Sequence, residues 1–247
     1  MMHKIVFYIP LLCISLQFFA VNVFAEIFVH DMIAVRNEKT LLKAETKGRF
    51  YRKGGELVEF LVNGKSIGKT LSGGDGFVFK QFASQKTGLH KITVKSATET
   101  SDGTLLVLNK GAGIFFADVE SSLLDGGLFA KKPREGSQKA IKEINKRYPV
   151  IILQTGFVSK KTIKEWLSKN GYPLLPVMPW GNGNIFDEFT EKGMKIIAVA
   201  GNNAIIDSAA EYKPLSFSFT GKDGAIDVKN WDEIRKKLLK KKDKESR

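Results

Sequence analysis

The segment GIFFADVESSL (residues 113–123) joins an uninterrupted apolar run to a cluster of acids and hydroxyls. Two later segments have the same form, PVIILQTG (149–156) and MKIIAVAGNN (194–203). Runs that are apolar on both faces are typical of buried parallel strands. Amphipathic helices are predicted beside these runs, over residues 137–147, 159–170, 185–192 and 205–212. Strands of this kind alternating with helices predict a parallel α/β sheet.

The chain before this region has a different pattern. Residues 57–62 (LVEFLV) predict a strand, and Asn63-Gly64 predicts the tight turn of a hairpin. GLHKITV (88–94) predicts a further strand, in which we expect His90 to be structural. Short strands with frequent turns are typical of a β-sandwich. The run from Phe60 to Val94 resembles bacterial immunoglobulin-like domains, which implies an all-β domain over residues 26–104.

Polar side chains follow the three apolar runs where each predicted strand ends. In open α/β sheets, ligands bind at the carboxyl ends of the strands. Carboxylate and amide oxygens are ligands that Mg²⁺ prefers, and a carboxylate can act as nucleophile or as general acid. We therefore expect a site there for Mg²⁺ and a phosphate group. The side chains that follow the runs are Asp118, Glu120, Ser122, Thr155, Asn202, Asn203 and Asp207, with the backbone of Gly156.

At these residues the chain resembles the haloacid dehalogenase-like (HAD) superfamily, and most closely its lipin and phosphatidate phosphatase branch. The resemblance rests on the DVESS motif at Asp118, on the segment from Thr155 to Pro179, and on Gly201-Asn202-Asn203 with Asp207. It implies a fold class of α/β, with a HAD-like parallel α/β sheet domain over 105–230 behind a small all-β immunoglobulin-like sandwich.

The resemblance also implies roles for the individual residues. Asp118 would be the nucleophile and Glu120 the acid/base, and both would bind Mg²⁺ together with Asn202 and Asp207. Thr155 and Lys192 would hold the phosphoryl group, with Lys195 as the alternative lysine. Ser122, Gly156 and Asn203 would contact the substrate. Glu120 departs from the second aspartate of the family motif, and a shift of about 1 Å in a catalytic group can cost on the order of a hundredfold in rate.

Residues 1–25 have the features of a cleavable signal peptide. Lys4 precedes an apolar stretch from Ile5 to Val21, and Val23-Phe24-Ala25 fits a cleavage site before Glu26. The alternative is an uncleaved anchor, since 17 residues lie at the lower limit for spanning a bilayer. Cys13, the only cysteine, lies inside this segment. Export therefore predicts a mature chain without disulfides, in the periplasm or outside the cell.

The chain is basic, with 39 Lys and Arg against 26 Asp and Glu and a net charge of +13. Residues 234–247 contain eight basic and two acidic residues. Residues 231–247 predict a final helix that runs into a basic tail. The tail has two readings: a solvated helix end, or a contact for anionic lipid. We expect no nucleic-acid partner for an exported protein.

Three functions are compatible with the sequence. The first is an exported Mg²⁺-dependent phosphatase that acts on a phosphate ester, with a phosphorylated small molecule or phospholipid as substrate. The alternative is a module with weakened catalysis that binds anionic lipid or a protein partner in the cell envelope. The third is a purely structural cell-envelope protein in which neither domain binds metal.

Overall fold

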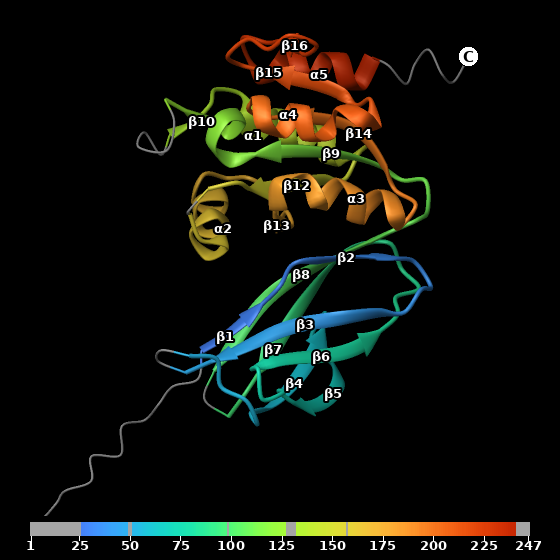
Figure 1. Ribbon diagram of the computed structural model, residues 1–247, viewed down its shortest axis with the longest axis vertical. Coiled ribbons are helices and arrows are strands. Elements are labelled where there is room, and N and C mark those ends of the chain that lie inside the picture. The colour runs from blue at the N-terminus through green and yellow to red at the C-terminus, as the bar shows by residue number, and fades with distance from the viewer. Residues whose placement is uncertain (1–25, 49–50, 98, 127–131, 157, 241–247) are drawn as a thin grey trace, which may run out of the picture.

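The computed structural model describes residues 26–240, apart from 49–50, 98, 127–131 and 157 (Figure 1). The predicted signal peptide (1–25) and the last part of the basic tail (241–247) lie outside the described residues. Among the described residues, no helix combines the length and apolarity needed to cross a bilayer.

The first half of the chain forms two packed sheets. One is antiparallel, in the order β1 (Glu26–Val29), β3 (Thr40–Lys47), β6 (Phe77–Phe82). The other has the order β2 (Met32–Val35), β8 (Thr100–Leu108), β7 (Gly88–Lys95), β4 (Leu57–Val62), β5 (Lys65–Leu71). In this second sheet only β2 and β8 run parallel. Alternate residues of both sheets, including Leu42, Phe60 and Ile92, fill a buried apolar core between them.

Two local predictions in this half are confirmed. Asn63 and Gly64 both have positive φ angles, 50° and 81°, and connect β4 to β5. His90 is buried in β7, where its Nδ1 lies 2.9 Å from Asn63 Nδ2 and its Nε2 lies 2.9 Å from the Lys86 carbonyl. The imidazole therefore ties the hairpin turn to the β6–β7 connection.

The second half contains a six-stranded sheet whose paired strands all run parallel. Its order is β13 (Val177–Pro179), β12 (Val150–Gln154), β9 (Gly113–Asp118), β14 (Lys195–Ala200), β15 (Leu215–Ser218), β16 (Ile226–Asp227). After β9, the chain adds β12 and β13 on one side of it and then β14, β15 and β16 on the other side. The order thus reverses between β9 and β14, where open sheets of this type leave a crevice. A two-stranded ribbon, β10 (Leu124–Asp125) and β11 (Lys132–Pro133), follows β9.

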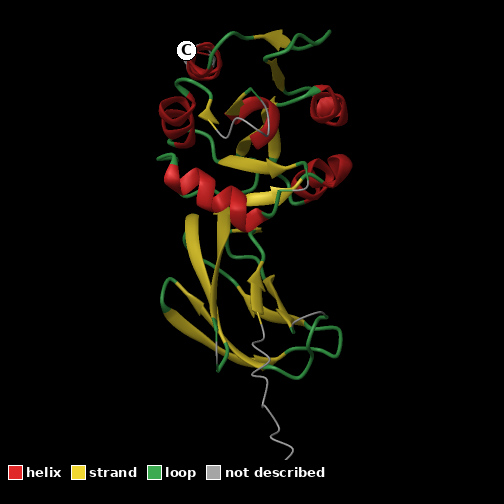
Figure 2. Ribbon diagram, turned by 90° about the vertical axis from the view of Figure 1, so that its left-hand side faces the viewer, coloured by secondary structure: helices red, strands yellow, loops and turns green. Residues whose placement is uncertain are grey.

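Helices cover both faces of the parallel sheet (Figure 2). One face buries the apolar sides of α1 (Ser137–Asn145), α2 (Lys160–Lys169) and α5 (Trp231–Lys240). The other packs against α3 (Asn184–Glu191) and α4 (Asn203–Ala209), and also against β2 and β8 of the sandwich. Short turns of helix connect these elements: η1 (Val119–Leu123), η2 (Gly181–Gly183) and η3 (Ala210–Tyr212).

The helices predicted from residue 137 and from residue 159 begin differently in the structure. Ser159 caps α2 by accepting from the Thr162 amide, and Gly171 follows the helix with φ 75°. Ser137, in contrast, is the first residue of α1 and not its N-cap, which is Gly136 with φ 74°. The Ser137 hydroxyl instead lies 2.6 Å from the Tyr172 hydroxyl and donates to the Arg134 carbonyl.

The fold class expected from the sequence is wrong for the chain as a whole. Strands make up 40% of the structure and helices 27%, so the all-β part is not a small addition to an α/β domain. Three of the four sheets are antiparallel or mixed. The apolar runs of β9, β12 and β14 give the strongest sequence signal and indicate the parallel sheet, although most of the strands lie outside that sheet.

A buried carboxylate joins the two halves. Asp31, in the turn between β1 and β2, has a fully buried side chain. It accepts from the amides of Thr104 in β8 and Val177 in β13, both at 2.8 Å, and from Lys164 Nζ of α2 at 2.6 Å. One carboxylate thus binds the sandwich, the edge of the parallel sheet and a helix. We call Asp31, Lys160 and Lys164 the joint.

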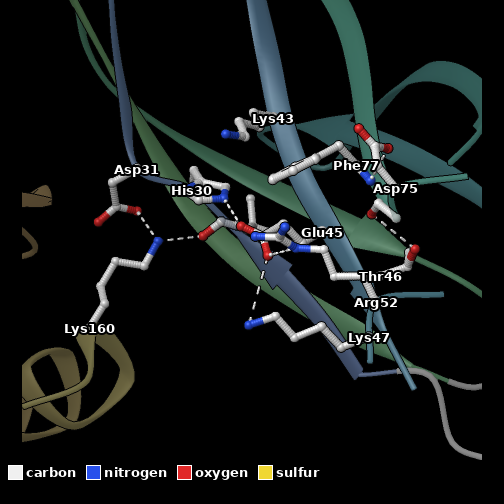
Figure 3. Close-up of polar contacts among 12 residues, drawn as sticks. His30, Asp31, Lys43, Glu45, Thr46, Lys47, Arg52, Asp75, Phe77 and Lys160 are labelled. Carbon is white, nitrogen blue, oxygen red and sulfur yellow. Dashed lines mark hydrogen bonds and ion pairs between the residues drawn. The ribbon is translucent and has the colours of Figure 1, made fainter. Parts of the chain in front are cut away.

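Lys160 of α2 completes the joint (Figure 3). Its ammonium donates to the Val29 carbonyl, lies 3.9 Å from Asp31 and sits 4.3 Å above the Phe28 ring. Burial lowers the pKa of Lys160 to about 8, against the opposing effect of the Asp31 carboxylate. Next to it, His30 pairs with Glu45 at 2.8 Å, and burial lowers the His30 pKa.

Candidate functional site

The crevice between β9 and β14 begins at Asp118, the last residue of β9. Its carboxylate caps the single π-helical turn η1, and both of its oxygens are used. Oδ2 accepts from the Ser121 amide at 3.0 Å, while Oδ1 accepts from the Ser121 hydroxyl at 2.8 Å and the Ser122 amide at 2.9 Å. The side chain is fully buried, and this burial raises the Asp118 pKa to about 6, although the hydrogen bonds oppose the shift.

Ser122 lies in the same turn, and its polar groups bind backbone and side chains that hold the turn in place. Its hydroxyl donates to the Asp118 carbonyl, and its own carbonyl accepts from Trp231 Nε1 at 2.8 Å. The Asp118-x-x-Ser121-Ser122 pattern is therefore a helix-capping pattern, and it accounts for these residues without any ligand.

Glu120, Thr155 and Gly156 lie together at the end of β12. A Cβ added to Gly156 would lie 1.9 Å from Glu120 Oε1, so the carboxylate rests directly against the glycine backbone. Glu120 and Thr155 both line an apolar pocket beside α2. The Thr155 hydroxyl is buried and has no hydrogen-bond partner in the part of the chain that the structure describes.

The predicted residues after β14 belong to the start of α4. Asn202 is the N-cap of this helix, and its Oδ1 accepts from the Ile205 amide at 3.1 Å. Asn203 is exposed at the first helical position. Asp207 is also exposed, and it forms an ion pair of 3.0 Å with Lys222.

The two candidate lysines lie at the amino ends of the strands, away from Asp118 at the carboxyl end of β9. Lys195 begins β14 and is in register with Gly113, five residues before Asp118. At about 3.3 Å per residue, the positions of Gly113 and Asp118 along β9 are roughly 17 Å apart. Lys192 precedes the strand and pairs with Glu188 at 3.3 Å. The structure thus brings Asp118 close to Ser122, and Glu120 close to Thr155 and Gly156, but it brings neither lysine to them.

The expected Mg²⁺ ligands do not fit a metal site in this arrangement. Both oxygens of Asp118 are occupied by its own turn, the Asn202 oxygen caps α4, and Asp207 faces Lys222. Across the described part of the chain, no group of three His, Cys, Asp or Glu side chains is close enough to hold an ion.

A basic surface lies on α1 and α5, which pack against each other. Residues 137–147 carry a net charge of +3 and Trp231–Lys240 a net charge of +2. The exposed cations of the two segments form what we call the basic face: Lys139, Lys142, Lys146, Arg147, Lys236, Lys237 and Lys240.

The helices of the basic face enclose a groove. Lys146 and Arg147, at the end of α1, line it together with Arg235, Lys236 and Lys240 of α5. Three ion pairs neutralise part of this set. Arg235 contacts Glu143 at 2.6 Å and also contacts Asp232, and Lys236 contacts Asp232 at 2.6 Å. No described acid forms an ion pair with Lys142, Lys146 or Lys240.

A second hollow of about 570 Å³ adjoins the groove, and Lys146 and Arg147 line both. Lys110 and Leu174 contribute to this hollow, and Leu174 is 60% exposed. Basic and apolar groups therefore occur side by side on one surface. The sequence indicated only the α5 half of this face, because the contribution of α1 depends on how the two helices pack.

No protein-family model matches the chain, and no curated protein matches it. Solved structures match about a third of it and are β domains. A domain pair of intimin is 14% identical over 34% of this chain and 46% of its own, with a TM-score of 0.29. Two domains of an S-layer protein are 19% identical over 35% of this chain and 54% of their own, with a TM-score of 0.26. The CARDB domain of a Pyrococcus furiosus protein is 12% identical over 36% of this chain and 94% of its own, with a TM-score of 0.28. The chain spans only 12% of the first solved structure in the comparison, a β-glucuronidase.

These comparisons correct the family assignment. The neighbours are immunoglobulin-like, fibronectin-type and CARDB-type β domains, which agrees with the immunoglobulin-like character expected for the first half, and none is HAD-like. The resemblance to the HAD superfamily is therefore wrong. Its motifs were short, and an acid at the end of a parallel strand followed by serines arises here from the capping of η1.

Proposed function

We propose that this protein is an exported, non-enzymatic module that attaches to anionic lipid at the cell envelope. The observation that carries the proposal is the basic face, where two packed helices and the residues that follow α1 present seven exposed cations, four of which line one groove. The sequence of the predicted signal peptide supports export, and the basic residues 241–247 continue directly from α5.

The charges of this region suit a membrane surface. Each Lys or Arg close to an anionic bilayer contributes about 1 kcal/mol of attraction. Residues 137–147, 231–240 and 241–247 carry +3, +2 and +2, which is more than half of the net charge of the chain. Leu174 and the alkyl stems of the lysines add apolar contact at the headgroup level.

The test is vesicle cosedimentation at about 0.1 M salt, comparing phosphatidylcholine vesicles with vesicles that contain phosphatidylglycerol. We expect binding only to the anionic vesicles, and release at higher salt because screening shortens the reach of the charges. The triple variant Lys142→Gln, Lys146→Gln, Lys240→Gln should lose about 3 kcal/mol, or roughly a hundredfold in affinity.

A matched triple variant separates the basic face from overall charge. Lys65→Gln, Lys69→Gln and Lys95→Gln remove three exposed cations from β5 and β7, in the other half of the molecule. We expect this control to keep most of the affinity. Equal losses in both triple variants would show that net charge alone drives binding and would overturn the proposal.

A further inference from the structure

A pocket of about 290 Å³ lies at the carboxyl edge of the parallel sheet, between η1 and α2. It is distinct from the basic face. Its interior is largely apolar and includes Val119, Leu153, Ile163 and Trp166. Concave sites of this kind, apolar with a few polar groups, are where small molecules bind.

Two polar groups near the end of β12 have no hydrogen-bond partner among the described residues. The Thr155 hydroxyl is one of three buried side-chain N or O atoms without a hydrogen bond in the described structure. Buried polar groups are almost always paired. The Glu120 carboxylate forms no hydrogen bond or ion pair with a described residue, and it lies against Gly156. A ligand in this pocket would supply partners for both.

The charges around the pocket distinguish it from the rest of the protein. Glu165 and Lys169 are four residues apart and exposed on α2, and their opposite charges offset each other at the rim of the pocket. Glu120 therefore leaves the pocket with a net negative charge, on a chain whose net charge is +13. A phosphate would meet this carboxylate unfavourably, whereas a cation would be attracted to it.

We propose that this pocket binds a small apolar molecule that carries a protonated amine. The ammonium of the ligand would donate to the Glu120 carboxylate. The Thr155 hydroxyl would hydrogen-bond to a polar atom of the ligand close to the ammonium. The apolar body of the ligand would lie against Ile163 and the Trp166 indole. A cavity of 150 Å³ holds a benzene molecule, so this volume suits a ligand of about a dozen non-hydrogen atoms.

The experiment is a calorimetric titration of the purified protein with three probes of similar size: 2-phenylethylamine, 2-phenylethanol and 3-phenylpropionate. At neutral pH they differ mainly in head-group charge. We expect the amine to bind at least tenfold more tightly than the alcohol, and the carboxylate most weakly. Glu120→Gln should abolish the preference for the amine over the alcohol, and Thr155→Val should weaken both by several-fold.

Glu191→Gln, at the end of α3, is the matched control, since it removes an exposed acid that lies outside the pocket. It should leave the amine preference unchanged. The proposal is overturned by equal affinities of amine and alcohol in the unmodified protein, by an amine preference that persists in Glu120→Gln, or by the failure of all probes to bind at millimolar concentration. A thermal melt of each variant confirms that it is folded.

Discussion

Replacing Asp31 with asparagine tests whether one buried carboxylate holds the two halves together. Asparagine has nearly the same shape, but it keeps only one acceptor oxygen and carries no charge. If that oxygen takes the place of Oδ1, the Thr104 amide and the Lys164 ammonium keep an acceptor. The new NH₂ group then faces the Val177 amide, which loses its only acceptor at this position.

The size of the effect follows from these contacts. An unsatisfied buried amide costs about 1–3 kcal/mol. Lys160, with only 8% of its side chain exposed, also loses its counter-charge. Removing one partner of a buried ion pair costs about 3–5 kcal/mol, and Lys164, which is 23% exposed, is partly screened by water. We therefore expect a loss of about 3–4 kcal/mol, which lowers Tm by roughly 10 °C in a chain of this size.

The assay is urea unfolding followed by circular dichroism, with Asp102→Asn as the control. Asp102 also forms an ion pair, with Lys91 at 2.8 Å, but both side chains are at least half exposed. Its replacement should cost less than about 1 kcal/mol. A double-mutant cycle of Asp31→Asn with Lys164→Met should give a coupling energy of about 1–3 kcal/mol. If Asp31→Asn costs no more than Asp102→Asn, the joint does not hold the halves together.

Three further predictions concern the carboxyl edge. Because the folded Asp118 pKa is about 6 against an ordinary value of 3.8, the folded state binds this proton more tightly, so stability should fall by up to about 3 kcal/mol as pH rises from 4 to 6. Urea midpoints across that range should show this slope in the unmodified protein and not in Asp118→Asn. Thr155→Val should raise the unfolding free energy by about 1 kcal/mol, because it removes an unpaired buried hydroxyl, and a lower Tm would contradict that reading. Gly156→Ala should cost less than about 1 kcal/mol, because its Cβ would meet only the flexible carboxylate end of Glu120, and the loss should vanish in a Glu120→Ala background if that contact is the cause.

The sequence predicts the strands and several turns of this fold because their signals are local. The apolar runs locate β9, β12 and β14, and Asn63-Gly64 forms the turn it predicts. The helix predicted over 159–170 corresponds to α2, because the amphipathic pattern that predicts it is also local. The contact of the Ser137 hydroxyl with Tyr172, 35 residues away, has no such local signal.

The candidate site was harder to predict, because its chemistry depends on which contacts each side chain makes. Sequence reasoning placed Asp118, Thr155 and Asn202 at strand ends, and the structure has them there. It did not show that Asp118 and Asn202 would use their oxygens as helix caps. Nor could it indicate Asp31, whose partners Thr104, Lys164 and Val177 come from three distant segments.

Helix α2 links the joint to the pocket, because different faces of the helix contact each of them. Lys160 and Lys164 point to Asp31 and the sandwich, Ile163 and Leu167 enter the core, and Trp166 lines the pocket. From the sequence alone this helix shows one apolar side and one charged side, and the charged side looks like an ordinary solvated surface. In the structure two of its lysines are the ion-pair partners of a fully buried acid. Any shift of α2 that reshapes the pocket must therefore strain the contacts of Asp31, so the joint fixes the position of one wall of the pocket.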